Sequence, residues 1–559
     1  MIPMKTTFKF LFIALLMNVF FVPVTKAQLN DEEIKQIDEL FQSWNTPDHP
    51  GGSAGVVVND KLVYAKAFGL ASLEYLTPNT FGTQYNIASV SKQFTAFGIT
   101  LMHVRGQLSV DDDIRKYLPE LPEFDHTVTI RHLLHHTSGL RSLHTMLALA
   151  GWRGDDSRTN ADLLRLMINQ KDLNFVPGSE YMYCNTGYMF MSEIIERISG
   201  VEFSEWMKQE IFDPMGLNNT YVEEFYNRVV KNNATSYSAK RDGGFNRSVE
   251  YWGYVGSGNI HTNVQDLLTW LKQVRNPEPK WKEAMLLMRT TDPFNDGSHN
   301  KYAFGVNVEK YKGENRIQHG GSIGGFRSIA VTYPKRKTDI VILTNFSASN
   351  PGGKANQIAD IIMDKKPAER QGPKAYRLSL DKFDKISGRY SLINHPAKSI
   401  DIFRIGNGFY AAEKGKDRFR ITAISETEFT NNNGDVKITI GKDQGIGSKI
   451  IEYKNDQSYY NGTFLKSFEN DQQETKKLIG SYWSPELETQ YKLVLKEGEL
   501  KGYHTRHGWF DIRKVRDNEF NGSPSYFNFF KVKEDKRGRV LGIYVTNSRV
   551  RNLWLEKTN

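Results

Sequence analysis

The sequence predicts a mixed α/β domain followed by two all-β, barrel-like domains, and three observations lead to this fold class. From about Asn30 to Asp364, patterns typical of helices alternate with patterns typical of strands. After the polar stretch DKKPAERQGPKAYR the helical patterns stop, and short strands separated by Gly, Asn and Asp turns follow. Within that remainder one sequence pattern occurs twice, which indicates a pair of related domains.

Length and composition are those of an ordinary soluble protein with several domains. The chain has 559 residues, enough for three or four domains, and 39% of them are hydrophobic and 25% are charged. The formal net charge is +9, but the Lys and Arg residues are scattered and form no basic run or nucleic-acid motif. The charge therefore indicates a general attraction to anionic surfaces and no nucleic acid partner.

The N-terminal segment, residues 1–27, has the features of a signal peptide. Lys5 and Lys9 precede the apolar residues 10–23, and Ala27 in VTKAQ offers a small residue at a cleavage point. The apolar run is shorter than the ~20 residues that cross a bilayer, so we expect no stable membrane span. Cys184 is the only cysteine, which excludes an internal disulfide. The segment predicts an exported protein, periplasmic or secreted.

The first domain is expected at residues 28–368, and its first strands are predicted most clearly. SAGVVVNDKLVYAKAFG contains two β-branched runs that meet at Asn59 and Asp60, two residues that favour a tight turn. This stretch predicts a β-hairpin.

The repeat defines the other two domains. KISGRYS, with Tyr390, returns as KLIGSYW, with Tyr482, and FRITAISETEF returns as FDIRKVRDNEF at nearly the same offset. We therefore expect β-domains at residues 380–467 and 473–559, each large enough to fold on its own.

Ser89 and Lys92 in NIASVSKQFTAFGIT are the first candidate catalytic residues. On a helix, positions three apart lie on one face, so the amine of Lys92 is within reach of the Ser89 hydroxyl. The apolar residues that follow predict a buried helix, where an unused lysine is costly. The spacing indicates an activated nucleophile, although a serine at a helix start is also a common cap.

Tyr183 and Asn185 in FVPGSEYMYCNTGY are the second pair of candidates, in a turn before a predicted helix. A phenol can pass a proton and an amide can hold an acyl group, so the pair suits acyl transfer. An ordinary aromatic turn is the alternative.

The third candidate is His319-Gly320-Gly321 in RIQHGGSIGGFRSIAVTYP, on a predicted strand. Glycines there leave room for a ligand or another backbone to approach closely. A glycine-rich hairpin with an incidental histidine is the alternative.

Taken in order, these three motifs resemble those of the serine β-lactamase and penicillin-binding-protein superfamily. The resemblance covers about 330 residues, including VTIRHLLHHTSGL and GSGNIHTNVQDLLTWL, and is greatest to the wider serine hydrolases similar to class C enzymes. It implies an antiparallel sheet with flanking helices and a helical insertion. The His-x-Gly form of the third motif is that of D-aminopeptidases, whose catalytic domain is likewise followed by two β-barrels.

The resemblance also implies the chemistry. Ser89 would attack a carbonyl carbon and form an acyl-enzyme, while Lys92 and Tyr183 take the proton and return it to the leaving group. Backbone N–H groups of Ser89 and Ser322 would form the oxyanion hole. His319 is the fourth implied catalytic residue and would hydrogen-bond Tyr183 or the substrate. Asn185 would position the acyl group, and Gly320 and Gly321 would bind the substrate along the third motif.

The third motif departs from that of β-lactamases, in which a lysine and a hydroxyl precede the glycine. A neutral His319 and the bare Gly320 offer no cation for a substrate carboxylate, so we expect feeble turnover of penicillins and cephalosporins. Arg327 in GGFRS is the nearby cation that would compensate.

A metal site at the histidines of RHLLHHTSG is the main competing interpretation. His132 and His136 fall on one helical face, as zinc ligands often do, and His135 lies beside them. No carboxylate or cysteine ligand completes a motif nearby, and HGGSIGG lacks the context of a nucleotide site. We therefore expect neither a metal nor another cofactor.

The sequence leaves three functions open. A peptidase or amidase of the D-aminopeptidase or D-alanyl-D-alanine carboxypeptidase type ranks first, and an esterase acting on small acyl esters ranks second. A catalytically silent receptor or adhesion protein is the third, against which Ser89, Lys92, Tyr183 and Asn185 argue. The sequence does not indicate the physiological substrate or the oligomeric state. A loop of a C-terminal domain that reaches the active site and restricts it is a further expectation.

Overall fold

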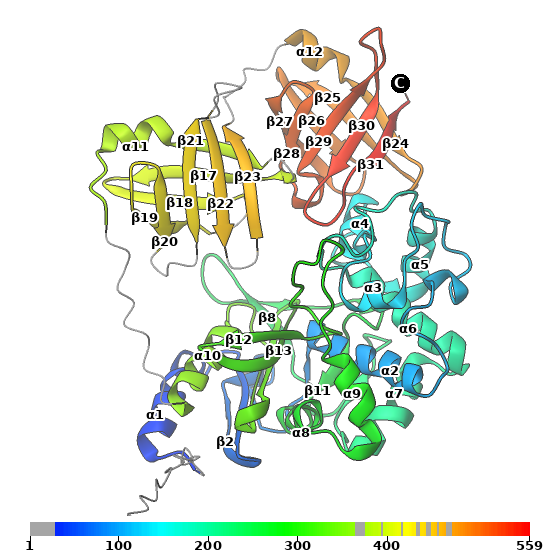
Figure 1. Cartoon of the computed structure of the whole chain (residues 1–559), viewed down its shortest axis with the longest axis vertical. Coiled ribbons are helices and arrows are strands. Elements are labelled where there is room, and N and C mark those ends of the chain that lie inside the picture. The colour runs from blue at the N-terminus through cyan, green and yellow to red at the C-terminus, as the bar shows by residue number, and fades with distance from the viewer. Residues whose placement is uncertain are drawn as a thin grey trace, which may run out of the picture.

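The computed structural model describes residues 28–363, 375–392, 395–414, 417–431, 436–442, 449–455, 458–464 and 472–558. The predicted signal peptide lies outside these ranges. Figure 1 shows an α/β domain in blue to green, a first barrel in yellow and a second barrel in orange to red. Among the helices of the described ranges, none has the length and apolarity that crossing a bilayer needs.

A six-stranded antiparallel sheet forms the centre of the α/β domain, in the order β12-β13-β14-β15-β1-β2. The predicted hairpin is confirmed, because β1 and β2 pair antiparallel and turn at Asn59 and Asp60, both with left-handed backbone (φ 51° and 64°). The strands are β1 (Gly52–Val58), β2 (Lys61–Phe68), β12 (Asn307–Tyr311), β13 (Glu314–Ile323), β14 (Phe326–Tyr333) and β15 (Thr338–Thr344).

Helices cover both faces of this sheet. α1 (Asp31–Glu39) and α10 (Pro351–Ile362) pack on one face. α8 (Val264–Arg275) packs on the other face, beside the buried helix α2 (Lys92–Val104). The rest of the helical side consists of α3 (Ile130–Leu134), α4 (Leu143–Leu149), α5 (Asn160–Ile168), α6 (Asn185–Ser199), α7 (Phe203–Met207) and α9 (Lys282–Met288). The predicted sheet with flanking helices and a helical insertion is confirmed.

Nine short strands lie outside the main sheet in this domain. They are β3 (Leu70–Ser72), β4 (Thr77–Pro78), β5 (Tyr85–Asn86), β6 (Arg158–Thr159), β7 (Tyr221–Val222), β8 (Ser236–Ala239), β9 (Phe245–Ser248), β10 (Trp252–Gly253) and β11 (Ile260–Thr262). The pairing of β5 with β11 matters most, because it fixes the segment that leads into Ser89.

Each C-terminal domain is a closed barrel of eight strands. The first comprises β16 (Gly388–Leu392), β17 (His395–Ile405), β18 (Gly408–Glu413), β19 (Phe419–Ala423), β20 (Glu428–Asn431), β21 (Lys437–Lys442), β22 (Lys449–Asn455) and β23 (Ser458–Phe464), preceded by α11 (Leu380–Ile386). The second comprises β24 (Gly480–Ser484), β25 (Thr489–Lys496), β26 (Glu499–His504), β27 (Gly508–Arg516), β28 (Glu519–Gly522), β29 (Phe529–Glu534), β30 (Val540–Thr546) and β31 (Leu553–Lys557), preceded by α12 (Gln472–Lys477).

Two tyrosines at equivalent positions show that the two barrels share one structural pattern. Tyr390 and Tyr482 are both fully buried on the first strand of their barrels. Each hydroxyl donates a hydrogen bond to the carbonyl four residues earlier, at Ile386 in one barrel and Leu478 in the other. The internal repeat predicted from the sequence therefore corresponds to a structural repeat.

The two barrels differ in how they join the α/β domain. The first has an apolar core of its own, whereas the apolar core of the second is continuous with that of the helical side of the α/β domain. At the junction the Tyr491 hydroxyl donates to the carbonyl of Leu149 at 2.7 Å. In Figure 1 the second barrel accordingly lies against the region of α4.

Candidate active site

Ser89 lies in a single 3₁₀ turn, Ala88–Ser91, directly before α2. The preceding residue, Ala88, has left-handed backbone with φ 50°, and its N–H donates to the Asn86 side chain at 2.9 Å. This conformation costs an alanine ~1–2 kcal/mol, so the surrounding contacts impose it. The strained turn fixes where the Ser89 hydroxyl enters the site.

Lys92, the first residue of α2, is fully buried and faces the nucleophile. Its Nζ donates to the Ser89 Oγ at 3.2 Å and to the Ser257 carbonyl at 2.6 Å. Burial, reinforced by the positive charge of Arg549, holds the pKa of the Lys92 amine well below its usual value. A lowered pKa favours the neutral amine, which is the form that can accept a proton from Ser89.

Tyr183 presents its ring and hydroxyl to the same point. Lys92 Nζ lies 5.0 Å from the centre of its ring. Burial raises the pKa of the phenol, and interaction with the Ser89 hydroxyl offsets part of the rise. The hydroxyl is buried and makes no hydrogen bond of ordinary geometry within the described residues. It is thus a protonated group with free hydrogen-bonding capacity beside the nucleophile.

Asn185 begins α6, two residues after Tyr183, and is 7% exposed. Its Oδ1 is buried and has no hydrogen-bond partner within the part of the chain that the structure describes. A buried amide oxygen without a partner is costly, so this position favours a ligand N–H as the donor.

The third motif runs along β13, which passes directly beside the Ser89 turn. A Cβ at Gly321 would lie 2.2 Å from both the Ile87 carbonyl and the Ser328 hydroxyl, so a glycine is required there. The pairing of β12 with β13 ends at Gln318. From His319 onward this edge of β13 therefore has no strand partner among the described residues, which leaves its backbone groups available to a substrate.

His319 is 5% exposed and bonds to a residue that the sequence did not single out. Its Nδ1 donates to the Gly320 carbonyl at 2.7 Å, which leaves Nε2 to accept from the Tyr302 hydroxyl at 2.9 Å. Its ring centre lies 6.2 Å from that of Tyr183, and no His319–Tyr183 hydrogen bond forms. Burial lowers the pKa of His319 to about 3, so the imidazole is neutral.

Tyr302 was not predicted as a site residue, and His136 was considered only as a zinc ligand. His136 is fully buried, packs against the rings of Tyr183 and Tyr302 at 4.2 and 4.5 Å, and accepts from the Cys184 N–H through Nδ1. The two residues hold Tyr183 and His319 in place. The stretch around Tyr302 carries no motif of known spacing. The stretch RHLLHHTSG, which contains His136, suggested zinc ligands and no contact with Tyr183, so only the folded chain reveals these two roles.

The side chain of one predicted substrate-binding residue, Arg327, points away from this centre. Along β14, Ser328 bonds to the Ile87 carbonyl on the Ser89 side, and its neighbour Arg327 therefore faces the opposite side, as alternation requires. The Arg327 guanidinium donates to the Gly324 and Phe326 carbonyls instead. Ser322 is exposed on β13, beyond Gly321.

The three neighbouring histidines do not converge on one point. His132 Nδ1 accepts from the Thr129 N–H within the capping box of α3, and His135 bonds to Asp292 and to the Tyr302 carbonyl. With His136 bonded to Cys184, each of the three has a separate structural partner.

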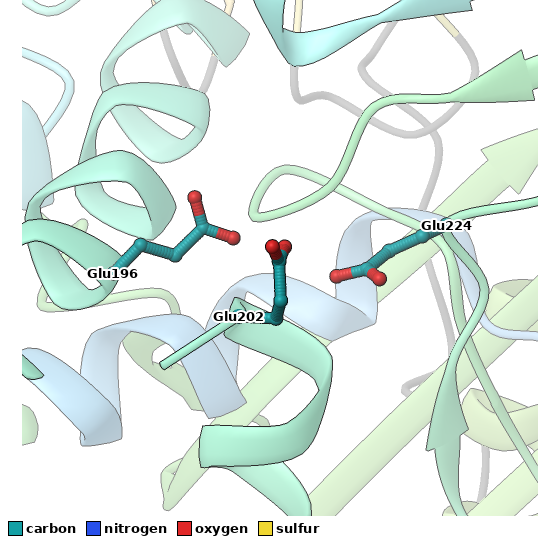
Figure 2. Close-up of side chains that lie close together, drawn as sticks. All are labelled: Glu196, Glu202 and Glu224. Carbon is teal, nitrogen blue, oxygen red and sulfur yellow. The ribbon is translucent and has the colours of Figure 1, made fainter. Parts of the chain in front are cut away.

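Within the described residues, Glu196, Glu202 and Glu224 are the one group whose potential ligand atoms all lie within 4.8 Å of one another. Figure 2 shows their carboxylates directed toward one another from α6, the start of α7 and the segment after β7. Glu196 accepts from the Phe203 N–H and Glu224 from the Ser204 N–H. Capping of α7 therefore accounts for this cluster.

A loop of the second barrel reaches the site, as the sequence analysis expected of a C-terminal domain. It joins β30 to β31, and the Arg549 guanidinium lies 5.3 Å from the centre of the Tyr183 ring. A residue of the last barrel thus borders the catalytic centre.

Ser89, Lys92 and Tyr183 together form the arrangement of an enzyme that transfers acyl groups through a serine. The beta-lactamase family model matches residues 35–362, and the chain belongs to this family. It is a serine hydrolase of the Ser-x-x-Lys type, as the resemblance implied.

Curated relatives include both penicillin-binding proteins and aminopeptidases. Penicillin-binding protein 4* of Bacillus subtilis is 27% identical over 331 residues, which covers 56% of this chain and 71% of that protein. A D-aminopeptidase of Cereibacter sphaeroides is 27% identical over 355 residues, 62% of this chain and 65% of its own length. The D-aminopeptidase of Brucella anthropi is 27% identical over 317 residues, which covers 56% of this chain and 59% of that protein. The match thus spans less than two thirds of these aminopeptidases.

Solved structures share the fold. The octameric penicillin-binding protein homologue from Pyrococcus abyssi aligns with a TM-score of 0.55 at 23% identity and covers 78% of this chain and 100% of its own. The structure of SurE aligns with a TM-score of 0.54 at 18% identity and covers 77% of this chain and 98% of its own. Both alignments cover more of the chain than the region that the family model matches.

Proposed function

We propose that the protein is an exported peptidase or amidase that forms an acyl-enzyme at Ser89. The observation that carries this proposal is the fully buried Lys92, with its Nζ 3.2 Å from the Ser89 hydroxyl and its pKa lowered well below the usual value. The name of several relatives, D-aminopeptidase, supports a substrate that contains D-amino acids.

In this mechanism the Ser89 oxygen attacks the scissile carbonyl carbon, and its proton moves to the neutral Lys92 amine. The carbonyl oxygen becomes an oxyanion, which backbone N–H groups of Ser89 and Ser322 stabilise, each worth ~3–4 kcal/mol. When the C–N bond breaks, the leaving amine takes a proton from Tyr183, which regains one from Lys92. Water then attacks the acyl-enzyme with the same groups acting in reverse.

The neighbouring contacts suit a peptide better than a simple ester. The unpaired edge of β13 beyond Gln318 offers backbone donors and acceptors to an extended chain. The Asn185 Oδ1, buried without a partner in the described residues, favours an N–H of the acyl portion. A small acyl ester has no N–H in its acyl portion and makes few of these contacts.

Labelling with a fluorophosphonate probe tests the nucleophile. The wild type should be labelled and Ser89→Ala should not, while Ser322→Ala, which keeps its backbone N–H, should still be labelled. Labelling that survives Ser89→Ala would refute the proposal, because Ser89 would then not be the nucleophile. The alternative of a receptor in which Ser89 has no catalytic role would remain.

Paired assays with D-alanine p-nitroanilide, an N-acetylated D-Ala-D-Ala peptide and p-nitrophenyl butyrate separate the substrate classes. We expect Ser89-dependent hydrolysis of an amide substrate at a kcat/KM at least equal to that of the ester. Turnover of the ester alone would establish the esterase alternative.

Export is proposed from residues 1–27 alone. Cell fractionation with an antibody, together with N-terminal sequencing of the mature protein, tests it. We expect the mature chain to begin at Gln28, and a cytoplasmic protein that retains Met1 would exclude export.

A further inference from the structure

The loop between β30 and β31 is held rigidly against the active site. Within it, the Asn547 Oδ1 accepts from the N–H groups of Arg549 and Val550 at 2.9 and 3.0 Å. From the α/β domain, the Ser142 N–H and the Asn174 side chain both donate to the Arg549 carbonyl. The backbone of Arg549 is thus fixed from both sides, which lowers the entropic cost of placing its side chain.

The next arginine of this loop, Arg551, has a structural role that serves as a comparison for Arg549. Arg551 forms a two-pronged ion pair with Glu180 at 3.0 and 2.9 Å, and its N–H donates to Asn174. It therefore serves to dock the loop.

Arg549 has no such partner. Within the described residues no carboxylate lies within ion-pair distance of its guanidinium, which is half-buried over the Tyr183 ring. Its charge acts on the site instead, because it lowers the pKa values of Lys92 and His136. A half-buried cation with no anion is a position that an anionic ligand can complete.

Among the described residues, no carboxylate shifts the pKa of a group of the catalytic centre. The groups that lower the pKa of His144 are Lys92, Arg549 and Arg158, besides burial, and that of His319 is lowered by burial and Lys92. No aspartate or glutamate of the described chain contributes to either shift. This environment attracts a carboxylate and repels a charged amine.

We propose that Arg549 of the second barrel binds a free carboxylate on the leaving residue of the substrate. This inference rests on the proposed function, in which Tyr183 protonates the leaving amine, because a cation over the Tyr183 ring lies on the leaving-group side. The substrate class is then a peptide cleaved next to its C-terminal residue. A peptide recognised by its free amine would need an anion here.

Two N-acetylated D-Ala-D-Ala peptides, one with a free C-terminal carboxylate and one with a C-terminal amide, test this assignment. We expect the wild type to prefer the free acid by about ten- to one-hundredfold in kcat/KM, the range of a charge-assisted contact. In Arg549→Gln the ratio of the two values should fall to about one, mainly through KM, and Arg549→Lys should restore part of it. Arg537→Gln, an exposed arginine of the same barrel, is the charge-matched control.

An equal loss on both peptides in Arg549→Gln would show that Arg549 acts through Tyr183 or through packing, and would overturn the assignment. So would a wild type without any preference for the free acid. Calorimetric binding of the free-acid peptide to Ser89→Ala, with and without Arg549→Gln, gives the answer without catalysis. Weaker binding of at least tenfold supports the assignment, and equal binding refutes it. Failure of the proposed function differs from both, because it would appear as turnover that Ser89→Ala does not abolish.

Discussion

Arg141 of the α/β domain and Glu486 of the second barrel form an ion pair in which both side chains are buried, with 0% and 2% of their surface exposed. The Arg141 guanidinium also donates to the Arg551 carbonyl, and the Glu486 carboxylate accepts from the Lys171 N–H. The pair therefore connects the barrel to the domain just behind the loop that carries Arg549. A contact of this kind determines the relative position of the two bodies more than it adds stability.

Removal of one partner of this pair should be strongly destabilising. Glu486→Gln leaves the buried Arg141 charge with only the exposed Asp172 carboxylate, at 3.9 Å, as a counter-charge, and loss of one partner of a buried ion pair typically costs ~3–5 kcal/mol. Urea unfolding measures the loss, and Arg141→Met combined with Glu486→Leu should recover most of it, since the double variant buries no charge. A loss below about 1 kcal/mol in the single variant would show that water enters the junction.

Truncation after residue 364 tests the shared apolar core. The sequence predicts that the second barrel is large enough to fold on its own, but in the structure its apolar core continues into the helical side of the α/β domain. We expect the truncated protein to melt at a lower temperature and to expose apolar surface, measured by calorimetry and by binding of a hydrophobic dye. Its substrate range should also change, because the loop with Arg549 is lost. An unchanged melting temperature would mean that the two cores are separable.

The pH dependence of acylation should reflect Lys92. Because burial and Arg549 lower the pKa of this amine, kcat/KM for an uncharged ester should rise with pH and level off at a pH well below 10.5. Removal of the Arg549 charge lets the pKa of Lys92 rise, so the rising limb in Arg549→Gln should move to higher pH. His319, with a pKa of about 3, should add no limb above pH 5. A limb that does not move in Arg549→Gln would assign the titration to another group.

Arg327 should have little influence on β-lactam turnover. Its side chain lies on the face of β14 opposite Ser89, so Arg327→Ala should change nitrocefin kcat/KM by about twofold or less. Stopped-flow absorbance on both proteins measures this. A tenfold loss would require the strand to rearrange when the substrate binds.

The glutamate cluster should make stability depend on pH. Burial and the neighbouring carboxylates raise the pKa of Glu196 to about 7, above its value of 4.5 in the unfolded chain. The folded state therefore holds the proton more tightly, and its stability should fall as pH rises from about 4.5 to about 7. Glu196→Gln keeps an acceptor for the Phe203 N–H and should remove this part of the decline. Urea unfolding at pH 5 and pH 8 measures it, and an equal decline in wild type and variant would point to other groups.

The sequence predicted those parts of the site that lie within short segments. Ser89 and Lys92 are three residues apart on one turn, and Gly321 has to be a glycine because of its contact with the Ile87 carbonyl, so each motif is readable locally. The orientation of Arg327 could not be predicted in this way. Strand alternation directs its side chain away from Ser89 only because Ser328 bonds to the Ile87 carbonyl, and these two residues are 241 positions apart in the sequence.

Long-range contacts account for what could not be predicted. Tyr302 meets His319 only because β13 passes beside the segment that precedes β12, and Arg549 reaches Tyr183 only because the second barrel docks on α4 and α5. Neither tyrosine nor arginine is unusual by type or spacing. Their roles depend on packing between distant segments, which periodicity does not encode.

The position of Arg549 in the loop between β30 and β31 has a consequence for the synthesis of the enzyme on the ribosome. Ser89 lies near the start of the chain and Arg549 near residue 550, so translation at ~5–20 residues per second separates them by roughly 20–90 s. During that interval a nascent chain holds its nucleophile without the cation that selects the substrate. If Arg549 binds the substrate carboxylate as proposed, the nascent chain acquires its nucleophile before its selectivity.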